Sequence, residues 1–379
     1  MQKAIFPKAT IGILGGGQLG MMLAQVAKRF SYKVVVFEPD ANCPAKYTAD
    51  KHIIASYSDT DAIMNFAKQC DVVTTEFENV PANVVRLIAE STPVYPSDSA
   101  LEVAQNRIKE KTFFNQIGLH TAPFKAINST NDIDSVSHDM FPAILKTSTL
   151  GYDGKGQVKV ANQFELINAY TKLGSVECIL EKMVDLKQEV SIVIARNQTG
   201  NAVYPVIENH HRNGILDISY FPANIDENIK SLAHEAAIKI ADGLNYVGLL
   251  TIEFFITQDN QLLINEIAPR PHNSGHVTIE ASVTSQFEQQ LRAVCGLKLG
   301  NTDVIKSGAM LNLLGDVWLD NTNADEVLLN HNPQAKYHSY NKLEAKRARK
   351  MGHVTILNDN RNRLEESISD LKQALKIPN

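Results

Sequence analysis

Residues 249–276 constrain the fold more than any other stretch, because they contain two strand-forming runs close enough to pair with each other. The runs TIEFFIT and QLLINEI are rich in β-branched and aromatic residues, and the polar residues between them favour a turn. If Asp259–Asn260 forms a two-residue hairpin loop, the register is fixed and Glu253 lies directly opposite Glu266. The sequence therefore predicts two facing carboxylates.

The facing glutamates have two interpretations. Like charges that form a cross-strand pair repel, so a purely structural hairpin would keep both carboxylates in water at a sheet edge. A divalent cation reverses this preference, because Mg²⁺ takes oxygen ligands and usually shares them with substrate phosphates. The polar loop that follows, with Arg270, His272, Asn273 and His276, favours the metal interpretation, since loops at strand ends usually carry function.

The first hundred residues alternate between short apolar strands and helices, which predicts a doubly wound α/β domain with a parallel sheet. The loop Gly15-Gly-Gly-Gln-Leu-Gly20 follows the first strand, and the second strand ends at Glu38. This spacing matches a dinucleotide-binding fingerprint, although the same loop can hold any phosphorylated ligand. An NAD-dependent oxidoreductase is therefore one possible function. The predicted strands are 11–15, 33–38, 52–56, 72–76 and 94–95.

Two acidic residues, Glu76 and Glu78, lie at the carboxyl end of the fourth of these strands. Open α/β sheets bind ligands at the carboxyl ends of their strands, so both are candidate substrate contacts. The alternative is that they only cap and solvate the loop.

The composition of the whole chain limits the function classes. Its 379 residues predict two or three domains, and a formal net charge of −5 gives no electrostatic reason to bind nucleic acid. No apolar run is long enough to span a bilayer, and no signal-peptide pattern is present. Four scattered cysteines without a Cys-x-x-Cys pair argue against a zinc site and a disulfide framework. We expect a cytoplasmic protein with no nucleic-acid or membrane partner.

A second glycine-rich loop lies in the middle of the chain, between two strands of a predicted hairpin. Strand 141–148 carries Lys146, the loop is Gly151-Tyr-Asp-Gly-Lys-Gly-Gln157, and strand 158–161 follows. A loop of this kind can fold over phosphates as a flap. Lys146 could then contact a phosphate, or it could be a surface lysine on an edge strand.

The segments around this flap are predicted as follows. The capping box Ser99-Ala-Leu-Glu102 opens one helix that runs to about Gly118, and another helix runs from Asp226 to Asp242. Strand 177–184 ends in a charged pair, and residues 189–195 alternate as a strand. His210 and His211 are neighbours in a strand, so at most one of them faces a given site.

These segments, in this order, resemble the ATP-grasp superfamily from about residue 100 to 300. Five motifs narrow the resemblance to the N5-carboxyaminoimidazole ribonucleotide synthetase family, over about residues 10 to 355. They are GGGQLG (15–20), TEFEN (75–79), GYDGKGQ (151–157), NEIAPRPHNSGH (265–276) and RKMGH (349–353). One departure is the basic run Lys346-Arg-Ala-Arg-Lys350, where the family often has Arg-Pro-Gly-Arg-Lys. The resemblance leaves open which of these basic residues meets the substrate.

The resemblance implies an α/β protein with the ATP-grasp fold, a Rossmann-like N-terminal domain and a small β-rich C-terminal domain. The implied boundaries are 1–105 for the first domain, 106–300 for the ATP-grasp domain and 301–379 for the last. The ATP-grasp domain would comprise a flap-bearing half, 106–185, and a metal-binding half, 186–300. Strands are expected at 307–314 and 337–356. The family is commonly dimeric, which implies a homodimer.

The implied reaction is the ATP-dependent carboxylation of 5-aminoimidazole ribonucleotide with bicarbonate, through carboxyphosphate, in purine biosynthesis. ATP and Mg²⁺ are the implied cofactors, with the metal on Glu253 and Glu266. Another ATP-grasp ligase, such as a formate-using relative, would have the same fold and metal site.

The resemblance also implies a set of site residues. Those for ATP are Arg107, Lys146, Gly151, Tyr152, Asp153, Gly154, Lys155, Gly156, Gln157, Glu181, Lys182, Met183, Val184, Glu189, His211, Asn265 and Glu266. Those for the ribonucleotide are Gln18, Leu19, Glu76, Tyr152, Asp153, Arg270, Lys342 and Arg349, with the first glycine loop around its phosphate. Those for catalysis are Arg270, His272, Asn273 and Lys342; the first three would hold bicarbonate.

Overall fold

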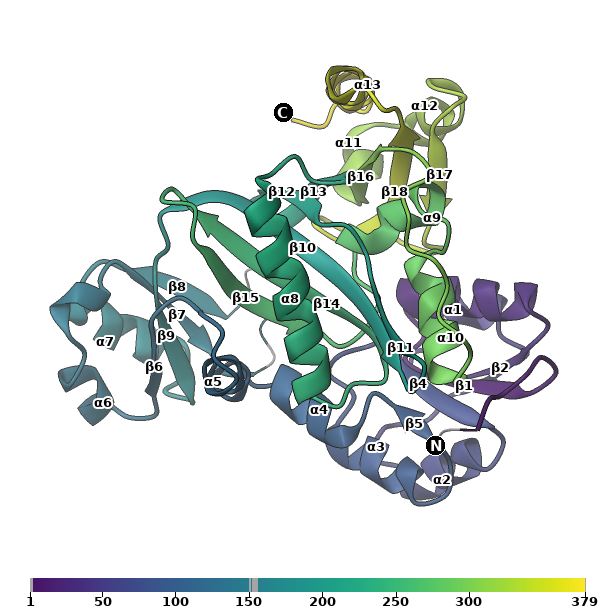
Figure 1. Cartoon of the computed structure of the whole chain (residues 1–379), viewed down its shortest axis with the longest axis horizontal. Helices are drawn as coiled ribbons and strands as arrows, with labels where there is room; N and C mark the ends of the chain where they lie inside the picture. The colour runs from purple at the N-terminus through teal and green to yellow at the C-terminus, as the bar shows by residue number, and fades with distance from the viewer. Residues whose placement is uncertain (1–2, 150, 152–155, 379) are drawn as a thin grey trace.

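The computed structural model describes residues 3–149, 151 and 156–378. It contains three sheets, each with its own helices (Figure 1). The N-terminal parallel sheet lies at the lower right of the view, a four-stranded sheet at the left, and a long nine-stranded sheet runs from the centre to the upper right. Among the described residues, no helix is long and apolar enough to cross a membrane.

The N-terminal sheet is parallel throughout, with strand order β3-β2-β1-β4-β5, which confirms the predicted doubly wound domain. Apolar side chains on both faces explain why the strands are almost continuously hydrophobic. The helices α1 and α10 cover one face, while α2 and α3 cover the other. The elements are β1 (Thr10–Leu14), α1 (Gln18–Arg29), β2 (Lys33–Phe37), η1 (Pro44–Tyr47), β3 (Lys51–Ile53), α2 (Thr60–Ala67), β4 (Val72–Thr75), α3 (Ala82–Ala89), β5 (Val94–Tyr95) and α10 (Gln286–Val294).

The single helix predicted over residues 99–118 is wrong, because the structure has two helices there, α4 (Asp98–Ala104) and α5 (Arg107–Gln116). Ser97 caps α4 by accepting a hydrogen bond from the backbone of Ala100. Asn106 caps α5 by accepting from two backbone amides of its first turn. A second capping side chain therefore starts a new helix at the point where the sequence pattern suggested continuation.

The four-stranded sheet is antiparallel, with order β6-β9-β7-β8, and two helices pack against it. Its β7–β8 hairpin carries the second glycine-rich loop. The elements are β6 (Phe124–Ile127), α6 (Thr130–Asp134), η2 (His138–Met140), β7 (Ala143–Thr147), β8 (Gln157–Val160), α7 (Gln163–Lys172) and β9 (Cys178–Lys182).

The nine-stranded sheet has the order β15-β14-β10-β12-β13-β16-β18-β17, and β11 pairs with β10. The C-terminal strands continue this sheet through the β13–β16 pairing, so the expected boundary near residue 300 does not interrupt it. The strand predicted over 337–356 is two strands joined by a loop. The strands are β10 (Leu186–Asn197), β11 (Gly200–Val203), β12 (Ile207–Arg212), β13 (Ile215–Phe221), β14 (Gly248–Thr257), β15 (Leu262–Ala268), β16 (Gly308–Leu314), β17 (Lys336–Ser339) and β18 (Lys350–Leu357).

Helices cover this sheet at several places. The helix α8 lies across β10, β14 and β15, whereas the short helices η3 and α9 follow the glutamate hairpin. Three further helices accompany the C-terminal strands, and α13 packs on β16 and β18. The helices are α8 (Glu227–Gly243), η3 (Ser274–Val277), α9 (Thr278–Ala281), α11 (Asp316–Asp320), α12 (Ala324–Asn330) and α13 (Arg361–Ala374).

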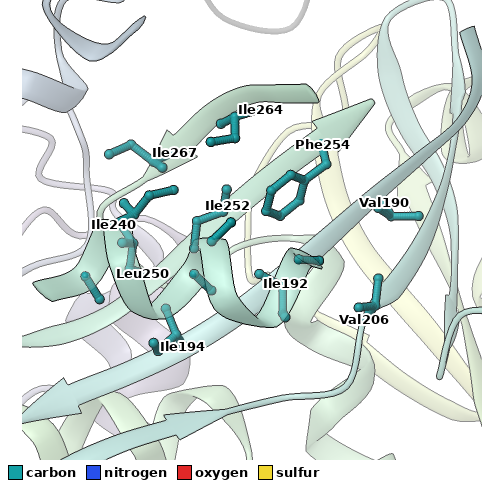
Figure 2. Close-up of a cluster of buried hydrophobic side chains, with 14 of the residues drawn as sticks. Val190, Ile192, Ile194, Val206, Ile240, Leu250, Ile252, Phe254, Ile264 and Ile267 are labelled. Carbon is teal, nitrogen blue, oxygen red and sulfur yellow. The ribbon is translucent and has the colours of Figure 1, made fainter. Parts of the chain in front are cut away.

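The face of the sheet beneath α8 is apolar. Ile192, Ile252 and Phe254 point toward α8 and form one buried cluster with Ile240 of that helix (Figure 2). Since side chains alternate along a strand, Glu253 points to the opposite face of the sheet. One side of the sheet is thus a hydrophobic core, and the other side is free to carry a polar site.

Candidate active site

The predicted pairing of Glu253 with Glu266 is confirmed, because the two residues are partners in the β14–β15 ladder. The predicted two-residue loop is wrong, since Thr257 pairs with Gln261 across a three-residue loop. This loop shifts the register by one residue near the turn, and a β-bulge between Glu253 and Phe254 shifts it back. Asn265 is the additional residue of that bulge.

The bulge decides where the second glutamate points. Ile264 pairs with Phe254, and both side chains lie in the cluster under α8 (Figure 2). In a regular strand Glu266 would share a face with Ile264 and would point into this apolar cluster. The additional residue turns Glu266 to the other face, beside Glu253.

Helix α5 supplies hydrogen bonds to the backbone of the bulged strand on both sides of Glu266. Lys111 Nζ donates to the Asn265 carbonyl at 3.1 Å, and Glu110 Oε1 accepts from the Ile267 amide at 2.7 Å. A bulge leaves backbone groups without ladder partners, so these two buried side chains stabilise it. Burial raises the pKa of Glu110 well above its usual value, and the nearby charge of Glu266 adds to that rise.

The pKa values of the paired carboxylates shift in opposite directions. Burial raises the pKa of Glu253, but His272, His211 and Lys350 outweigh it and lower the pKa to about 2. Burial and the negative charge of Glu253 both raise the pKa of Glu266. Each carboxylate has a polar neighbour. His272 Nε2 lies 3.0 Å from Glu253 Oε1, and Arg107 Nη2 lies 3.9 Å from Glu266 Oε2.

The two carboxylates fit a magnesium ion in part. Two adjacent acidic groups, one with a raised pKa, indicate a place where positive charge is favourable. No group of three or more His, Cys, Asp or Glu side chains suited to a metal occurs among the described residues. A magnesium ion here would therefore need further oxygen ligands from a bound phosphate or from water, which is how this ion is usually held.

Three cationic side chains surround the base of the flap. Glu181 Oε2 lies 3.0 Å from Lys146 Nζ and 3.4 Å from Lys111 Nζ, and all three residues come from different elements. Burial raises the pKa of Glu181, but the two lysines lower it overall. Arg107 donates to the carbonyl of Gly151 at 3.0 Å. The arrangement gathers net positive charge beside the glutamate hairpin.

Some of the remaining residues implied for ATP lie near the base of the flap and the glutamate pair. His211 Nδ1 is 2.8 Å from Glu189, and this carboxylate raises the pKa of His211 against the opposing effect of burial. His210 instead contacts Glu208, so only one of the two adjacent histidines faces the glutamates, as predicted. Tyr152, Asp153, Gly154 and Lys155 lie outside the described residues. Gly156, Gln157 and the segment Glu181–Val184 border the flap and the end of β9.

The loop after the hairpin is held in place by Gln286 of α10. This side chain accepts from the amide of His272 at 2.9 Å and donates to its carbonyl at 2.8 Å. In the same loop Arg270 forms an ion pair with Glu78, which follows β4 in the N-terminal domain. Asn273 is buried, and its Nδ2 atom has no hydrogen-bond partner in the described part of the chain.

The first glycine loop already holds carboxylates on its amides. Glu76 accepts from Gly17 at 2.8 Å and from Gly20 at 3.1 Å, and Glu38 accepts from Gly16 at 2.9 Å. Burial raises the pKa of Glu76, although both amides oppose that shift. The loop is so tight that a Cβ atom on Gly17 would lie 2.9 Å from Glu76 Oε1. The amides expected to bind a phosphate therefore have partners within the protein.

The C-terminal basic run divides into residues that face away from the hairpin and one that acts on it. Arg347 pairs with Asp316 and Asp320 of α11, whereas the charge of Lys350 lowers the pKa of Glu253. Lys342 donates to the Lys350 carbonyl at 2.6 Å, and Arg349 donates to a carbonyl in the loop between β17 and β18. Lys350 is thus a member of the run whose charge acts on Glu253.

Some residues of the site were missed in the sequence. The roles of Glu110, Lys111 and Gln286 depend on partners far away along the chain, and no local pattern marks them. Only the structure shows that these polar side chains are buried, and buried polar groups require partners.

Comparison with known families divides the chain into three matching regions. Residues 8–105 match the ribonucleotide synthetase preATP-grasp domain, and residues 112–287 match the ATP-grasp domain. Residues 308–367 match the phosphoribosylaminoimidazole carboxylase C-terminal domain. These matches confirm the ATP-grasp fold expected from the sequence.

Individual relatives are similar over almost the whole chain. The N5-carboxyaminoimidazole ribonucleotide synthase of Brucella melitensis is 44% identical over 353 residues, which cover 92% of this chain and 96% of that protein. The synthetase of Staphylococcus aureus, solved in complex with ADP, has a TM-score of 0.91 and 39% identity, covering 97% of this chain and 98% of that one. The synthase of Aspergillus clavatus, solved with ADP and 5-aminoimidazole ribonucleotide, has a TM-score of 0.90 and 30% identity, covering 98% and 100%. The chain belongs to the N5-carboxyaminoimidazole ribonucleotide synthase family.

Proposed function

We propose that this protein carboxylates 5-aminoimidazole ribonucleotide with bicarbonate at the expense of ATP, in purine biosynthesis. The products are N5-carboxyaminoimidazole ribonucleotide, ADP and phosphate. The observation that carries the proposal is the pairing of Glu253 with Glu266, next to the cationic groups at the base of the flap. Bound ADP and 5-aminoimidazole ribonucleotide in the Aspergillus clavatus relative support the choice of substrates.

At the nucleotide end, Lys146 and Arg107 would neutralise and align the triphosphate, with the flap over it. Phosphoryl transfer depends mainly on positioning and charge stabilisation, so these cations suit the step. When bound, Mg²⁺ would offset the charge of the β- and γ-phosphates from its place on Glu253 and Glu266. Adenine would meet the backbone of Glu181–Val184. The amides of Lys182 and Met183 already donate to proline carbonyls, which leaves the Val184 amide for the base.

We also propose contacts to the nucleoside. Glu189 and His211 form a pair on the sheet face that carries the glutamates, and we place them beside the ribose. Asn265 would contribute to nucleotide binding indirectly, because it is the bulge residue that sets the direction of Glu266.

Bicarbonate would lie by the loop that follows the hairpin. Arg270 presents a planar guanidinium, which can hold a planar anion through parallel hydrogen bonds. Asn273 Nδ2 is a buried donor without a partner among the described residues, so an anion would satisfy it. Transfer of the γ-phosphoryl group to bicarbonate gives carboxyphosphate, which delivers carbon dioxide to the amine of the ribonucleotide. We do not extend the anion contact to His272, because its Nε2 atom is engaged by Glu253.

The ribonucleotide would occupy the region between the N-terminal domain and the loop before β18. Gln18 and Leu19 begin α1 at the first glycine loop, while Lys342 and Arg349 come from the C-terminal side. We assign Glu76 the role of shaping this loop through the two amides it holds. Tyr152 and Asp153 would complete the pocket from the flap. We further place the enzyme in the cytoplasm as a homodimer.

The function is tested by measuring ADP release in bicarbonate buffer with and without 5-aminoimidazole ribonucleotide. We expect ribonucleotide-dependent ADP release, together with transfer of ¹³C from labelled bicarbonate into the product. Transfer of label from formate would point to another ATP-grasp ligase. Absence of any nucleotide hydrolysis with tight NADH binding would contradict the assignment altogether.

A further inference from the structure

Three buried polar side chains form a line across adjacent strands, on the sheet face that carries Glu253. Ser191 of β10, Asn209 of β12 and Ser219 of β13 are 0%, 5% and 0% exposed. Asn209 Nδ2 donates to Ser191 Oγ at 2.9 Å, and Ser219 Oγ donates to Asn209 Oδ1 at 2.8 Å. Polar groups in such an interior are costly unless they are hydrogen-bonded, and here every contact between them is made.

The line continues into the loop after the glutamate hairpin. Ser191 Oγ lies 2.8 Å from Ser274 Oγ, and Ser274 Oγ lies 2.9 Å from Nδ1 of His272. The other ring nitrogen, Nε2, is 3.0 Å from Glu253 Oε1. One chain of hydrogen bonds therefore runs from the middle of the sheet to His272, whose Nε2 atom lies against the carboxylate proposed to hold the metal.

The backbone amide of Ser274 fixes which group donates in each hydrogen bond of this series. The amide of Ser274 donates to His272 Nδ1 at 3.3 Å, and an amide can only donate, so Nδ1 is an acceptor. The ring proton is then on Nε2, the atom that faces Glu253 Oε1. Because the Ser274 hydroxyl also donates to Nδ1, its oxygen accepts from Ser191, whose oxygen in turn accepts from Asn209. All donors point toward Glu253.

We infer that Ser274, Ser191 and Asn209 are positioning residues that hold His272 as the Nε2–H tautomer and thereby direct one oxygen of Glu253. This inference rests on the proposed function, because it takes Glu253 as a ligand of the metal–nucleotide complex. With Oε1 engaged by the imidazole, Oε2 is the oxygen presented to a cation. Hydrogen bonds that all run in one direction polarise and strengthen one another. Mutating residues that hold a metal ligand from behind typically lowers metal affinity or activity about 10- to 100-fold.

The direct test observes the ring of His272 in the protein without nucleotide. Imidazole ¹⁵N spectra at fixed slightly alkaline pH distinguish a pyridine-like nitrogen from a pyrrole-like one, and His272→Asn identifies the signals. We expect a pyridine-like Nδ1 and a pyrrole-like Nε2 in the wild type. Ser274→Ala should shift the Nδ1 signal strongly, and Ser191→Ala should shift it less. A pyrrole-like Nδ1 in the wild type, or spectra unchanged in both variants, would overturn the inference.

A matched control comes from Ser282, which is also buried but whose hydroxyl has no hydrogen-bond partner among the described residues. Ser282→Ala should leave the His272 signals unchanged. In calorimetry, Ser274→Ala should weaken ADP binding on the order of 10-fold with Mg²⁺ present and little without it. Equal weakening under both conditions would contradict a role through Glu253. Since neither readout requires turnover, a failure of the proposed reaction would remain distinguishable from a failure of this inference.

Discussion

Glu266 lies directly opposite Glu253 only because Asn265 adds one residue to the strand between the turn and the pair. The turn and the bulge each shift the register by one residue, and the two shifts cancel at the glutamates. Lys111 and Glu110 hold the bulge from α5, so the position of one carboxylate depends on a helix more than a hundred residues earlier in the chain.

Replacing Glu266 with glutamine should abolish ribonucleotide-dependent ADP formation while leaving the fold intact. One carboxylate of the pair is lost, so the metal–nucleotide complex would lack a ligand. The melting temperature of the nucleotide-free protein should be unchanged or slightly higher, because burial and Glu253 already disfavour the charge of Glu266. Steady-state kinetics and thermal melts check both points, with the exposed Glu235→Gln on α8 as the control. Near-normal turnover at ordinary Mg²⁺ would refute the metal assignment.

Glu76→Gln should destabilise the N-terminal loop and raise the KM for the ribonucleotide more than that for ATP. An amide side chain can accept from Gly17 or Gly20 but presents N–H groups to the other, so one buried amide loses its acceptor. The expected loss of unfolding free energy is about 1–3 kcal/mol. Denaturant unfolding measures it against the exposed Glu90→Gln. Equal increases of both KM values would indicate general misfolding instead.

Glu181→Leu should cost more stability alone than together with Lys111→Met. Glu181 and Lys111 are 5% and 2% exposed at their side chains, and removing the carboxylate leaves the buried ammonium group without its counter-charge, although it keeps its hydrogen bond to the Asn265 carbonyl. Breaking a buried ion pair from one side typically costs about 3–5 kcal/mol, whereas apolar replacement of both partners costs less. Urea unfolding of the two single variants and the double variant tests this. Additive losses would show that the two residues are not coupled.

Acidification should destabilise the protein through two stacked histidines, His276 and His353, whose rings lie 4.8 Å apart. Burial lowers the pKa of both well below the usual value, and neighbouring histidines add to the effect. Below a pH of about 6.5 the unfolded chain binds protons that the folded protein cannot accept, so stability falls by up to about 1.4 kcal/mol per pH unit for each ring.

The measurement is the slope of unfolding free energy against pH between about 6.5 and 5.5, in the wild type and in His276→Phe. Phenylalanine can stack between Phe287 and His353 as the imidazole does. The variant should show a shallower slope whatever its absolute stability. Identical slopes would mean that His276 does not titrate with unfolding.

Arg270→Lys should lower kcat at least about 10-fold while ATP affinity stays near normal. Lysine keeps the positive charge beside Glu78 but cannot form two parallel hydrogen bonds to an anion. Product formation and calorimetric ATP binding are compared, with Arg196→Lys as a control, since Arg196 pairs with Asp242 at a distance from the glutamates. Product formation at the wild-type rate would leave Asn273 as the remaining candidate for holding bicarbonate.

The sequence was informative where a signal is local. Alternating strands and helices defined the parallel domain, and strand alternation correctly separated His210 from His211. The facing glutamates were predicted correctly but from an incorrect loop, because hairpin length cannot reveal a bulge stabilised from another element. The break between α4 and α5 was missed because Asn106 was taken as part of a continuing helix.

The site was harder to predict than the fold because its contacts are long-range. Glu76 was expected among the substrate contacts, yet it holds the amides of the glycine loop that were assigned to a phosphate. His272 was grouped with the anion-binding residues, yet its ring lies against Glu253. In both cases the residue types indicated polar chemistry, whereas only three-dimensional contacts showed which partner was already present.

The β13–β16 pairing has a mechanical consequence. The backbone ladder joins the C-terminal strands to the sheet that carries Glu253, so this part of the chain cannot swing away without breaking main-chain hydrogen bonds. Among the described strands, none of the four-stranded sheet is laddered to the long sheet. Any displacement between the two sheets would therefore leave the spacing between the glutamates of β14 and β15 and Lys350 of β18 unchanged, because these strands belong to one hydrogen-bonded sheet.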